Sequence, residues 1–473
     1  MIELSVMPAT GSEPAQLQHD VRTSLDWRDW DSGLEEARQL RKPVLCLAEQ
    51  PWSNSAQRLA LFFHEDPELL DVVATGFIPV LVDPDRHPAL TERILVAASQ
   101  LEETFGPPML ALLSEEGLPL VTYCNIAFEG SDRRPSLLAL LRSTSDYYEA
   151  QRQECIVEAR GLQQVAAGHT APGQNLFLPV WSLSRQPDPG MLDGLLGAGT
   201  TDQLDLTFHR AARMPGWGVP HFEKTALQNA AMANVLRASD HPAAGDHARA
   251  AAEFALRCVH NGSSGLASDT PFYTWASSEV LESLPPDELQ LIGLHYRISA
   301  SSSRHVLNQV RSVADAVALA NGTTAENARQ ALERGKQRLY QTRLQRRAPA
   351  KLPPAGRAEA LLTIGELLRY GREELGLLQQ FKELSDSVMA TGSLHEHASA
   401  LYALSRVLAV AGPGLTDLAA TSAAHWDELR AFQQAGTWYY DRQHTEPVPP
   451  VIPDHTVPSL RHLLQAVEAL QAA

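Results

Sequence analysis

Short apolar runs alternate with amphipathic stretches in residues 24–130, and this alternation limits the fold more than any other feature of the 473-residue chain. The amphipathic stretches predict helices over 32–42, 66–76 and 88–106. The apolar runs PVLCLAE and FIPVLVD predict strands over 43–49 and 77–83. The segment PMLALLSEEGLPLVTY predicts a hairpin over 108–123 that turns at Glu116 and Gly117. Two parallel strands joined by a helix require a right-handed crossover, and the hairpin adds an antiparallel edge.

This order, helix-strand-helix-strand-helix-strand-strand, is the order of a thioredoxin-like fold. We therefore expect an α/β thioredoxin-like domain over 24–160, preceded by an N-terminal extension over 1–23. Residues 131–160 predict the last helix of that domain. The following segment, 161–195, is rich in Gly and Pro and has weak periodicity, so it is predicted to be the linker.

The rest of the chain is expected to be all-α, because no convincing strand pattern occurs after about residue 190. The predicted helices cover 222–239, 245–259, 277–296, 324–345, 357–371, 375–392, 395–412, 418–436 and 458–472. Gly and Pro turns between them favour antiparallel hairpins that close into an α/α barrel over 196–473. A helical solenoid is the alternative, but the sequence shows no fixed repeat period.

Composition limits the cellular compartments and the classes of partner that are expected. A formal net charge of −17 argues against nucleic acid, because binding phosphates needs a clustered cationic face. No apolar run is long enough to span a membrane, and the first residues lack the basic and apolar parts of a signal peptide. The four cysteines are far apart, as expected of buried thiols in a reducing compartment. We therefore expect a cytoplasmic protein with no membrane or nucleic-acid partner; the sequence indicates no oligomeric state.

Five motifs occur in the order found in one family of two-domain proteins. They are FHEDPELLDVVATGFIPVLVDPDRHP at 63–88, GPPMLALLSEEGLPL at 106–120, FHRAARMPGWGVPHFEKTALQNAAMAN at 208–234, FYTWASSEVLESL at 272–284 and DHTVPS at 454–459. They resemble proteins with a thioredoxin-like domain followed by an N-acylglucosamine 2-epimerase-like, six-hairpin α/α barrel, the spermatogenesis-associated thioredoxin-like group. The resemblance implies that fold for most of the chain, in a shortened and degenerate member.

The degeneracy is clearest at the redox positions. The family's C-H-W-C-H falls on SNSAQ, so Ser53 and Ala56 stand where the two thiols would be. Thiol–disulfide exchange needs a thiolate at the helix N-terminus and a second thiol three residues later. Ser53 is better explained as a helix N-cap. Pro108 matches the family's cis-proline, which either shapes a peptide-binding groove or only begins a strand rigidly.

The motif at 208–234 contains more ionisable and aromatic side chains than a purely structural turn needs. In α/α barrels of the epimerase and glycosidase type, His209 and His221 would serve as bases, Glu223 as acid or base, and Arg210 would orient sugar hydroxyls. Trp217 would stack on the sugar ring. The alternative is a buried polar network that closes the first hairpins. The catalytic and the structural interpretation are balanced for His209 and His221, whereas for Glu223 the structural interpretation is favoured.

Other candidates are weaker. Trp275 is expected in the core or the funnel wall, and Asp454 either caps the last helix or reaches the funnel. His395 and His397 are two residues apart on a helix start and do not converge on one metal. We expect neither a metal nor a cofactor.

Two functions follow from these observations. The first is a binding or regulatory protein that has lost redox chemistry, whose barrel holds a protein partner or a small sugar-like, polyhydroxylated ligand. The second is a carbohydrate-active enzyme, a sugar epimerase, isomerase or hydrolase, with its site in the barrel funnel. The loss of several motifs favours the first, and the retained FHR and VPHFEK favour the second.

Overall fold

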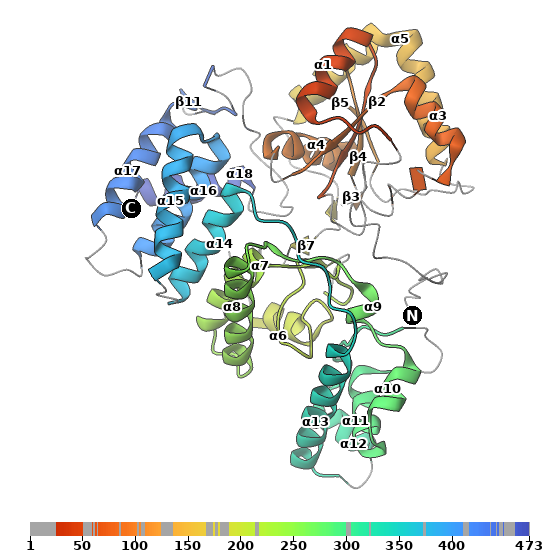
Figure 1. Cartoon of the computed structure of the whole chain (residues 1–473), viewed down its shortest axis with the longest axis vertical. Coiled ribbons are helices and arrows are strands. Elements are labelled where there is room, and N and C mark those ends of the chain that lie inside the picture. The colour runs from red at the N-terminus through yellow and green to blue at the C-terminus, as the bar shows by residue number, and fades with distance from the viewer. Residues whose placement is uncertain are drawn as a thin grey trace.

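The fold combines an N-terminal α/β part with a helical C-terminal part (Figure 1). The computed structural model describes residues 25–50, 59, 62–63, 65–84, 87–101, 104–105, 109–123, 136–166, 174–175, 178–179, 189–212, 217–298, 304–320, 323–371, 375–409, 416–435, 437–440, 442–443, 448 and 459–472. No helix within these residues is long and apolar enough to cross a membrane.

The α/β part has the element order predicted from the sequence. Its main elements are α1 (Trp30–Leu40), β1 (Val44–Ala48), α3 (Pro67–Gly76), β2 (Ile78–Val82), α4 (Pro88–Leu101), β4 (Met109–Leu113), β5 (Pro119–Tyr123) and α5 (Leu137–Ala166). Local signals fix the boundaries: Asp66 caps α3 by accepting hydrogen bonds from the backbone of Glu68 and Leu69, and Gly117 supplies the positive φ of 81° in the hairpin turn.

The four strands form one sheet in the order β2-β1-β4-β5, with β1 parallel to β2 and antiparallel to β4. Every residue of β1 is buried, because helices cover both faces of the sheet. Val44 and Cys46 share one core with α1 and α4, whereas Leu45 and Leu47 share the other with α3 and α5. This alternation along a strand is what a two-sided α/β core requires. The prediction of an α/β N-terminal domain is confirmed.

The C-terminal part is helical, as predicted. Its helices are α6 (Pro189–Gly197), α7 (Ala226–Arg237), α8 (Ala244–His260), α9 (Thr270–Tyr273), α10 (Ser277–Ser283), α11 (Pro286–Tyr296), α12 (Val313–Leu319), α13 (Ala325–Leu344), α14 (Arg357–Tyr370), α15 (Leu375–Thr391), α16 (Leu394–Leu408), α17 (Thr416–Arg430) and α18 (Leu460–Ala472). Helices α10 to α13 form one group, and α7, α8 and α14 to α18 form a second (Figure 1).

The second group has two layers. Helices α7, α14 and α16 are buried around most of their circumference, and α8, α15 and α17 pack against them. The three inner helices run in the same direction. Asn234 and Arg406 both contact Glu366 near their C-terminal ends, and Leu227 and Leu394 share a core at their N-terminal ends.

The helical part differs from the sequence-based prediction in two respects. The helix expected over 277–296 is two helices, α10 and α11, because Pro285 and Pro286 interrupt it. Short strands occur after residue 190, although none was predicted; they are β8 (Ala211–Ala212), β9 (Lys224–Thr225), β10 (Gly265–Leu266), β11 (Gln433–Gln434) and β12 (Thr437–Trp438). They are too short to produce a periodic pattern.

The segment expected to be a linker, 161–195, makes contacts of its own. Helix α5 runs to Ala166, and the segment carries β6 (Gln174–Asn175) and β7 (Leu178–Pro179). Strand β6 pairs with β3 (Thr104–Phe105), and β7 pairs with β8. The segment thus pairs with backbone from both parts of the chain.

Candidate functional site at the domain junction

The structure brings together four of the residues that the sequence singled out. The backbone of Arg210 donates to the carbonyl of Glu223 at 2.7 Å, and the backbone of His221 donates to Ala211 at 3.0 Å. This pairing holds two short segments of the 208–225 motif side by side. His209, Arg210, His221 and Glu223 therefore lie in one cluster, hereafter the junction cluster.

The junction cluster is buried. His209 is 2% exposed, Arg210 1%, His221 6% and Glu223 1%. At these exposed fractions the four side chains offer a substrate little accessible surface while the two parts of the chain are docked. The cluster therefore meets the sequence expectation of a buried polar network more closely than that of an open funnel.

The α/β part contributes directly to this cluster. Gln50, which follows β1 and is 1% exposed, accepts a hydrogen bond from the Arg210 guanidinium at 3.1 Å. A second nitrogen of that guanidinium lies 3.7 Å from the Glu223 carboxylate. Arg210 thus connects the end of β1 to the helical part. A buried guanidinium with these two partners is a specific docking contact rather than a surface ion pair.

His209 is surrounded by aromatic rings. Its imidazole lies 4.7 Å from the ring centre of Tyr273 and 5.6 Å from that of Phe222, both edge to face. Burial, with a further contribution from nearby Lys224, lowers the pKa of His209 to about 3. The imidazole is therefore neutral at pH 7 and is a poor general base, because its conjugate acid is too strong.

Beside His209 lies a buried ionic network that the sequence did not reveal. Lys224 donates to Asp202 at 2.6 Å and to Asp205 at 2.8 Å, and Arg343 donates to Asp202 at 2.7 Å. Burial alone would raise the pKa of Asp202, but Arg343 and Lys224 outweigh it and hold that pKa below its ordinary value. The network ties the 202–225 region to the end of α13.

The predicted ligand-binding tryptophans lie elsewhere. Trp275 is fully buried in the core of α10 to α13, with the Arg346 guanidinium 4.0 Å from its ring centre. Trp217 packs on a different core, built around α6, α7 and α8. Four other predicted positions lie outside the described residues, namely Ser53, Ala56, Pro108 and Asp454.

A second contact between the two parts involves Glu92 of α4. Its carboxylate accepts a hydrogen bond from the Tyr440 hydroxyl at 2.7 Å and another from the backbone of Leu460, the first residue of α18, at 2.7 Å. Next to it, Val96 packs with Leu227 and Leu394, at the N-terminal ends of the inner helices. The α/β part therefore covers the end of the helical part where these N-termini meet.

A cavity of about 260 Å³ remains between these contacts. Residues of both parts line it, among them Trp30 and Arg93 from the α/β side and His395 from α16. The cavity is thus lined by both parts of the chain.

The three described cysteines are poorly suited to redox chemistry. Cys46, Cys155 and Cys258 are buried. Burial raises the pKa of all three thiols, that of Cys258 to about 12. A thiol in such surroundings carries little thiolate at neutral pH, and the thiolate is the reactive form.

Sequence reasoning also missed a buried chain of side chains between α15, α16 and α17. Ser385 lies 2.7 Å from Nε2 of His425, whose Nδ1 lies 3.0 Å from Nδ1 of His397. All three are fully buried. From the sequence, His397 was considered only as a metal ligand. Its contact with His425 was not predicted, because two histidines 28 residues apart match no motif spacing. Among the residues described, no group of three or more His, Cys, Asp or Glu could hold a metal ion.

One comparison with known proteins matches the N-terminal part. Residues 10–166 match the family model of a protein of unknown function, DUF255, also named Thioredox_DsbH. The match spans the α/β part, so a thioredoxin-like domain is supported by both the family comparison and the order of elements. No curated protein matches the chain.

Proposed function

We propose that this chain is a binding or regulatory protein whose thioredoxin-like domain performs no thiol–disulfide exchange and instead closes one end of the helical part. The hydrogen bond between Gln50 and Arg210 carries this proposal. In a thioredoxin-type reaction the segment after this strand must reach a partner's disulfide. Here the end of β1 is buried against the helical part, so it serves docking.

The sequence and the thiols support the same conclusion. Ser53 and Ala56 occupy the positions of the two reactive cysteines in the resembled family. A serine hydroxyl is too weak an acid to replace a thiolate without a neighbouring base. The described thiols are buried and have raised pKa values, so none of them substitutes for the missing pair.

For the helical part we propose a segment of an α/α barrel that holds a protein partner or a small polyhydroxylated ligand. Parallel inner helices backed by outer helices are the arrangement of such barrels, and α7, α14 and α16 with α8, α15 and α17 fit it. The ligand would contact both parts of the chain in the 260 Å³ cavity at the junction.

The alternative is a carbohydrate-active enzyme that uses the junction cluster. It would require the two parts to separate, because His209 and His221 are 2% and 6% exposed. It would also require His209 to act as a base despite a pKa of about 3. These two observations favour the binding function over the enzyme.

The redox claim is tested by following insulin reduction in the presence of dithiothreitol. We expect the wild-type chain to match the uncatalysed rate. The double variant Ser53→Cys/Ala56→Cys is the positive comparison, because it restores the spacing of a reactive pair. Turnover by the wild type above background would overturn the claim.

The ligand claim is tested by thermal shift of the wild-type chain with a panel of sugars and sugar alcohols, and His221→Ala, a residue of the junction cluster that does not line the cavity, separates binding there from catalysis by the cluster. Stabilisation without conversion of the sugar supports binding. Product formation that His221→Ala abolishes would favour the enzyme instead, and no stabilisation by any sugar would leave the protein-partner form of the proposal.

A further inference from the structure

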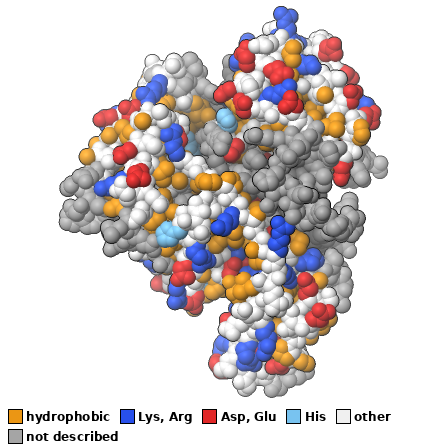
Figure 2. All heavy atoms as spheres, viewed as in Figure 1, with side chains coloured by type: hydrophobic (Ala, Val, Ile, Leu, Met, Phe, Trp, Pro, Cys, Tyr) orange, Lys and Arg blue, Asp and Glu red, His pale blue; other side chains and the backbone are white. Residues whose placement is uncertain are grey.

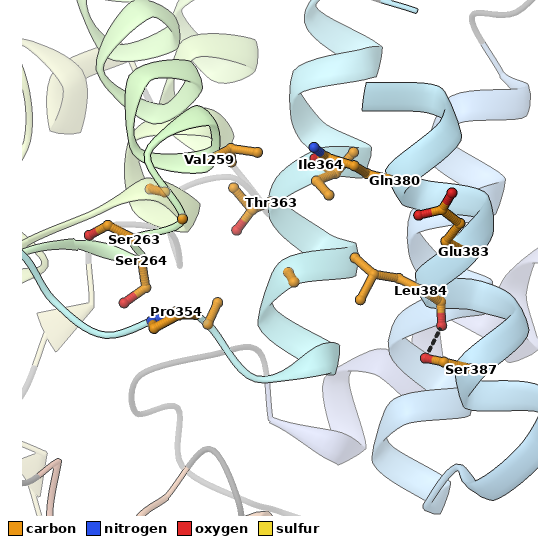
Figure 3. Close-up of a pocket in the computed structure, with 14 residues that line it drawn as sticks. Val259, Ser263, Ser264, Pro354, Thr363, Ile364, Gln380, Glu383, Leu384 and Ser387 are labelled. Atoms are coloured by element: carbon orange, nitrogen blue, oxygen red, sulfur yellow. Dashed lines mark hydrogen bonds between the residues drawn. The ribbon is translucent and has the colours of Figure 1, made fainter. Parts of the chain in front are cut away.

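The helical part has a pocket of about 390 Å³ on its outer side, separate from the junction cluster (Figure 3). It opens between the C-terminal end of α8 and helix α15, and helix α14 forms its floor. Val259, Ile364 and Leu384 give it an apolar interior. The size suits a small organic molecule, since typical ligand pockets measure roughly 300–1,000 Å³.

The hydroxyl groups around this pocket already donate hydrogen bonds to backbone carbonyls of the protein. Ser264 donates to the carbonyl of Pro353 at 2.7 Å, and Thr363 donates to Glu359 at 2.7 Å. Ser387 donates to the carbonyl of Leu384 at 2.7 Å, the bond drawn as a dashed line in Figure 3. Ser263 likewise donates to backbone carbonyls. A hydroxyl that has used its one proton offers a ligand only lone pairs.

The charged residue on the rim is also a hydrogen-bond acceptor. Glu383 of α15 lines the pocket and is exposed, and it is the only formally charged side chain among the described residues that line it. A carboxylate accepts hydrogen bonds and does not donate them. With the hydroxyls, it makes the rim rich in acceptors around an apolar interior, and Gln380 adds one amide that both donates and accepts.

We propose that this pocket binds a small organic amine, with its ammonium group beside Glu383 and its hydrocarbon body between Val259, Ile364 and Leu384. An ammonium brings donors and a positive charge to a rim of acceptors, and the apolar body fills the interior. A carboxylate would be repelled by Glu383, and an uncharged alcohol would donate one hydrogen bond to the rim but bring no positive charge. The proposal uses no residue of the junction cluster, so it stands or falls independently of the proposed function.

The test is binding of n-hexylammonium, hexanoate and 1-hexanol to the full-length chain, measured by isothermal titration calorimetry. These probes share one chain length and differ in charge. We expect n-hexylammonium to bind about tenfold or more tightly than the other two. Lengthening the ammonium probe by one methylene should raise its affinity by about three- to fourfold until the pocket is full.

Two variants assign the binding to this pocket. Glu383→Gln should reduce the affinity for n-hexylammonium to that for 1-hexanol. The matched control is Glu326→Gln, because Glu326 is also exposed and accepts from a glutamine four residues away, as Glu383 does from Gln379. Ala360→Leu, on the pocket floor, should weaken all three probes.

Each contrary result would refute one part of the amine-binding proposal. Equal affinity for the three probes would refute the preference for amines. An unchanged n-hexylammonium affinity in Glu383→Gln would refute the role of that carboxylate. Absence of binding by every probe would refute the site, and binding unchanged by Ala360→Leu would place it elsewhere.

Discussion

His397 and His425 face each other through their Nδ1 atoms at a distance of 3.0 Å in the buried space between α16 and α17. Only one of the two nitrogens can carry the proton of that hydrogen bond when both rings are neutral. Protonating the pair would place a positive charge in a fully buried site. Burial accordingly lowers the pKa of both rings, that of His425 to about 4.

We predict that the chain loses stability on acidification below about pH 6.5. A lowered pKa in the folded state means that the unfolded chain binds more protons between pH 6.5 and about 4, so stability falls as pH falls through this window. His209, with a pKa of about 3, acts in the same direction and extends the loss to lower pH. Urea unfolding at steps from pH 7.5 to 4.5 measures this slope, which for each histidine is at most about 1.4 kcal/mol per pH unit.

The comparison variant for this prediction is His425→Gln, which keeps hydrogen-bonding capacity but does not titrate. It should be less stable than wild type at pH 7.5 and should show a shallower decline towards pH 4.5. A decline as steep as that of the wild type would show that other groups control acid sensitivity.

A second prediction concerns Glu92, which links α4 to Tyr440 and to the first turn of α18. Glu92→Ala removes a helix cap and leaves two donors without their partner, so we expect a loss of about 1–3 kcal/mol in unfolding free energy. Limited proteolysis should also cut the C-terminal region faster. Tyr440→Phe removes one of the two bonds and should cost about 1 kcal/mol. Equal effects of both variants would contradict the capping role.

Much of the fold could be predicted because the elements of the α/β part are regular. Strands such as β1 read as apolar runs, and the turn at Gly117 shows in the sequence as a glycine. The two-residue strands could not be predicted, since pairing such as that of β9 with β10 depends on tertiary position rather than on periodicity. The Pro285–Pro286 pair was a visible signal that the helix over 277–296 would divide.

The candidate site was predictable only where its residues are close in sequence. The motif itself placed His209 and Glu223 near each other. Gln50 could not be added, because it is 160 positions from Arg210 and only the docking of two domains joins them. Arg343 meets Asp202 across 141 positions within the helical part, and only tertiary packing joins them.

Exposed charged side chains differ from the buried ion pairs in how much they contribute to stability. In Figure 2 acidic and basic side chains are interspersed among those coloured by type, without a broad region of one sign. Exposed ion pairs of this kind contribute little to stability. The buried pairs around Lys224 are therefore the ones whose loss should be measurable.

A third prediction follows for Lys224, whose side chain is fully buried against Asp202 and Asp205. Lys224→Met keeps most of the side-chain length but leaves the buried Asp202 and the half-buried Asp205 with less compensation, so we expect a loss of about 3–5 kcal/mol. Lys336→Met is the control, because Lys336 pairs with an exposed Glu333 and its loss should stay within about 0.5 kcal/mol. Chemical denaturation of both variants gives the comparison, and similar losses would contradict a special role for the buried network.

A fourth prediction tests the close packing of the inner helices. A Cβ added at Gly365 of α14 would lie 2.8 Å from the Cβ of Ala403 in α16, so Gly365→Ala must push two buried helices apart. We expect a loss of about 1–3 kcal/mol. Gly293→Ala in α11 is the matched change, because nothing lies within 4 Å of its added Cβ. It should stabilise the chain by about 0.5–1 kcal/mol through its higher helix propensity. Thermal and urea unfolding of the two variants should therefore shift in opposite directions, and a neutral Gly365→Ala would mean that α14 and α16 are not in van der Waals contact there.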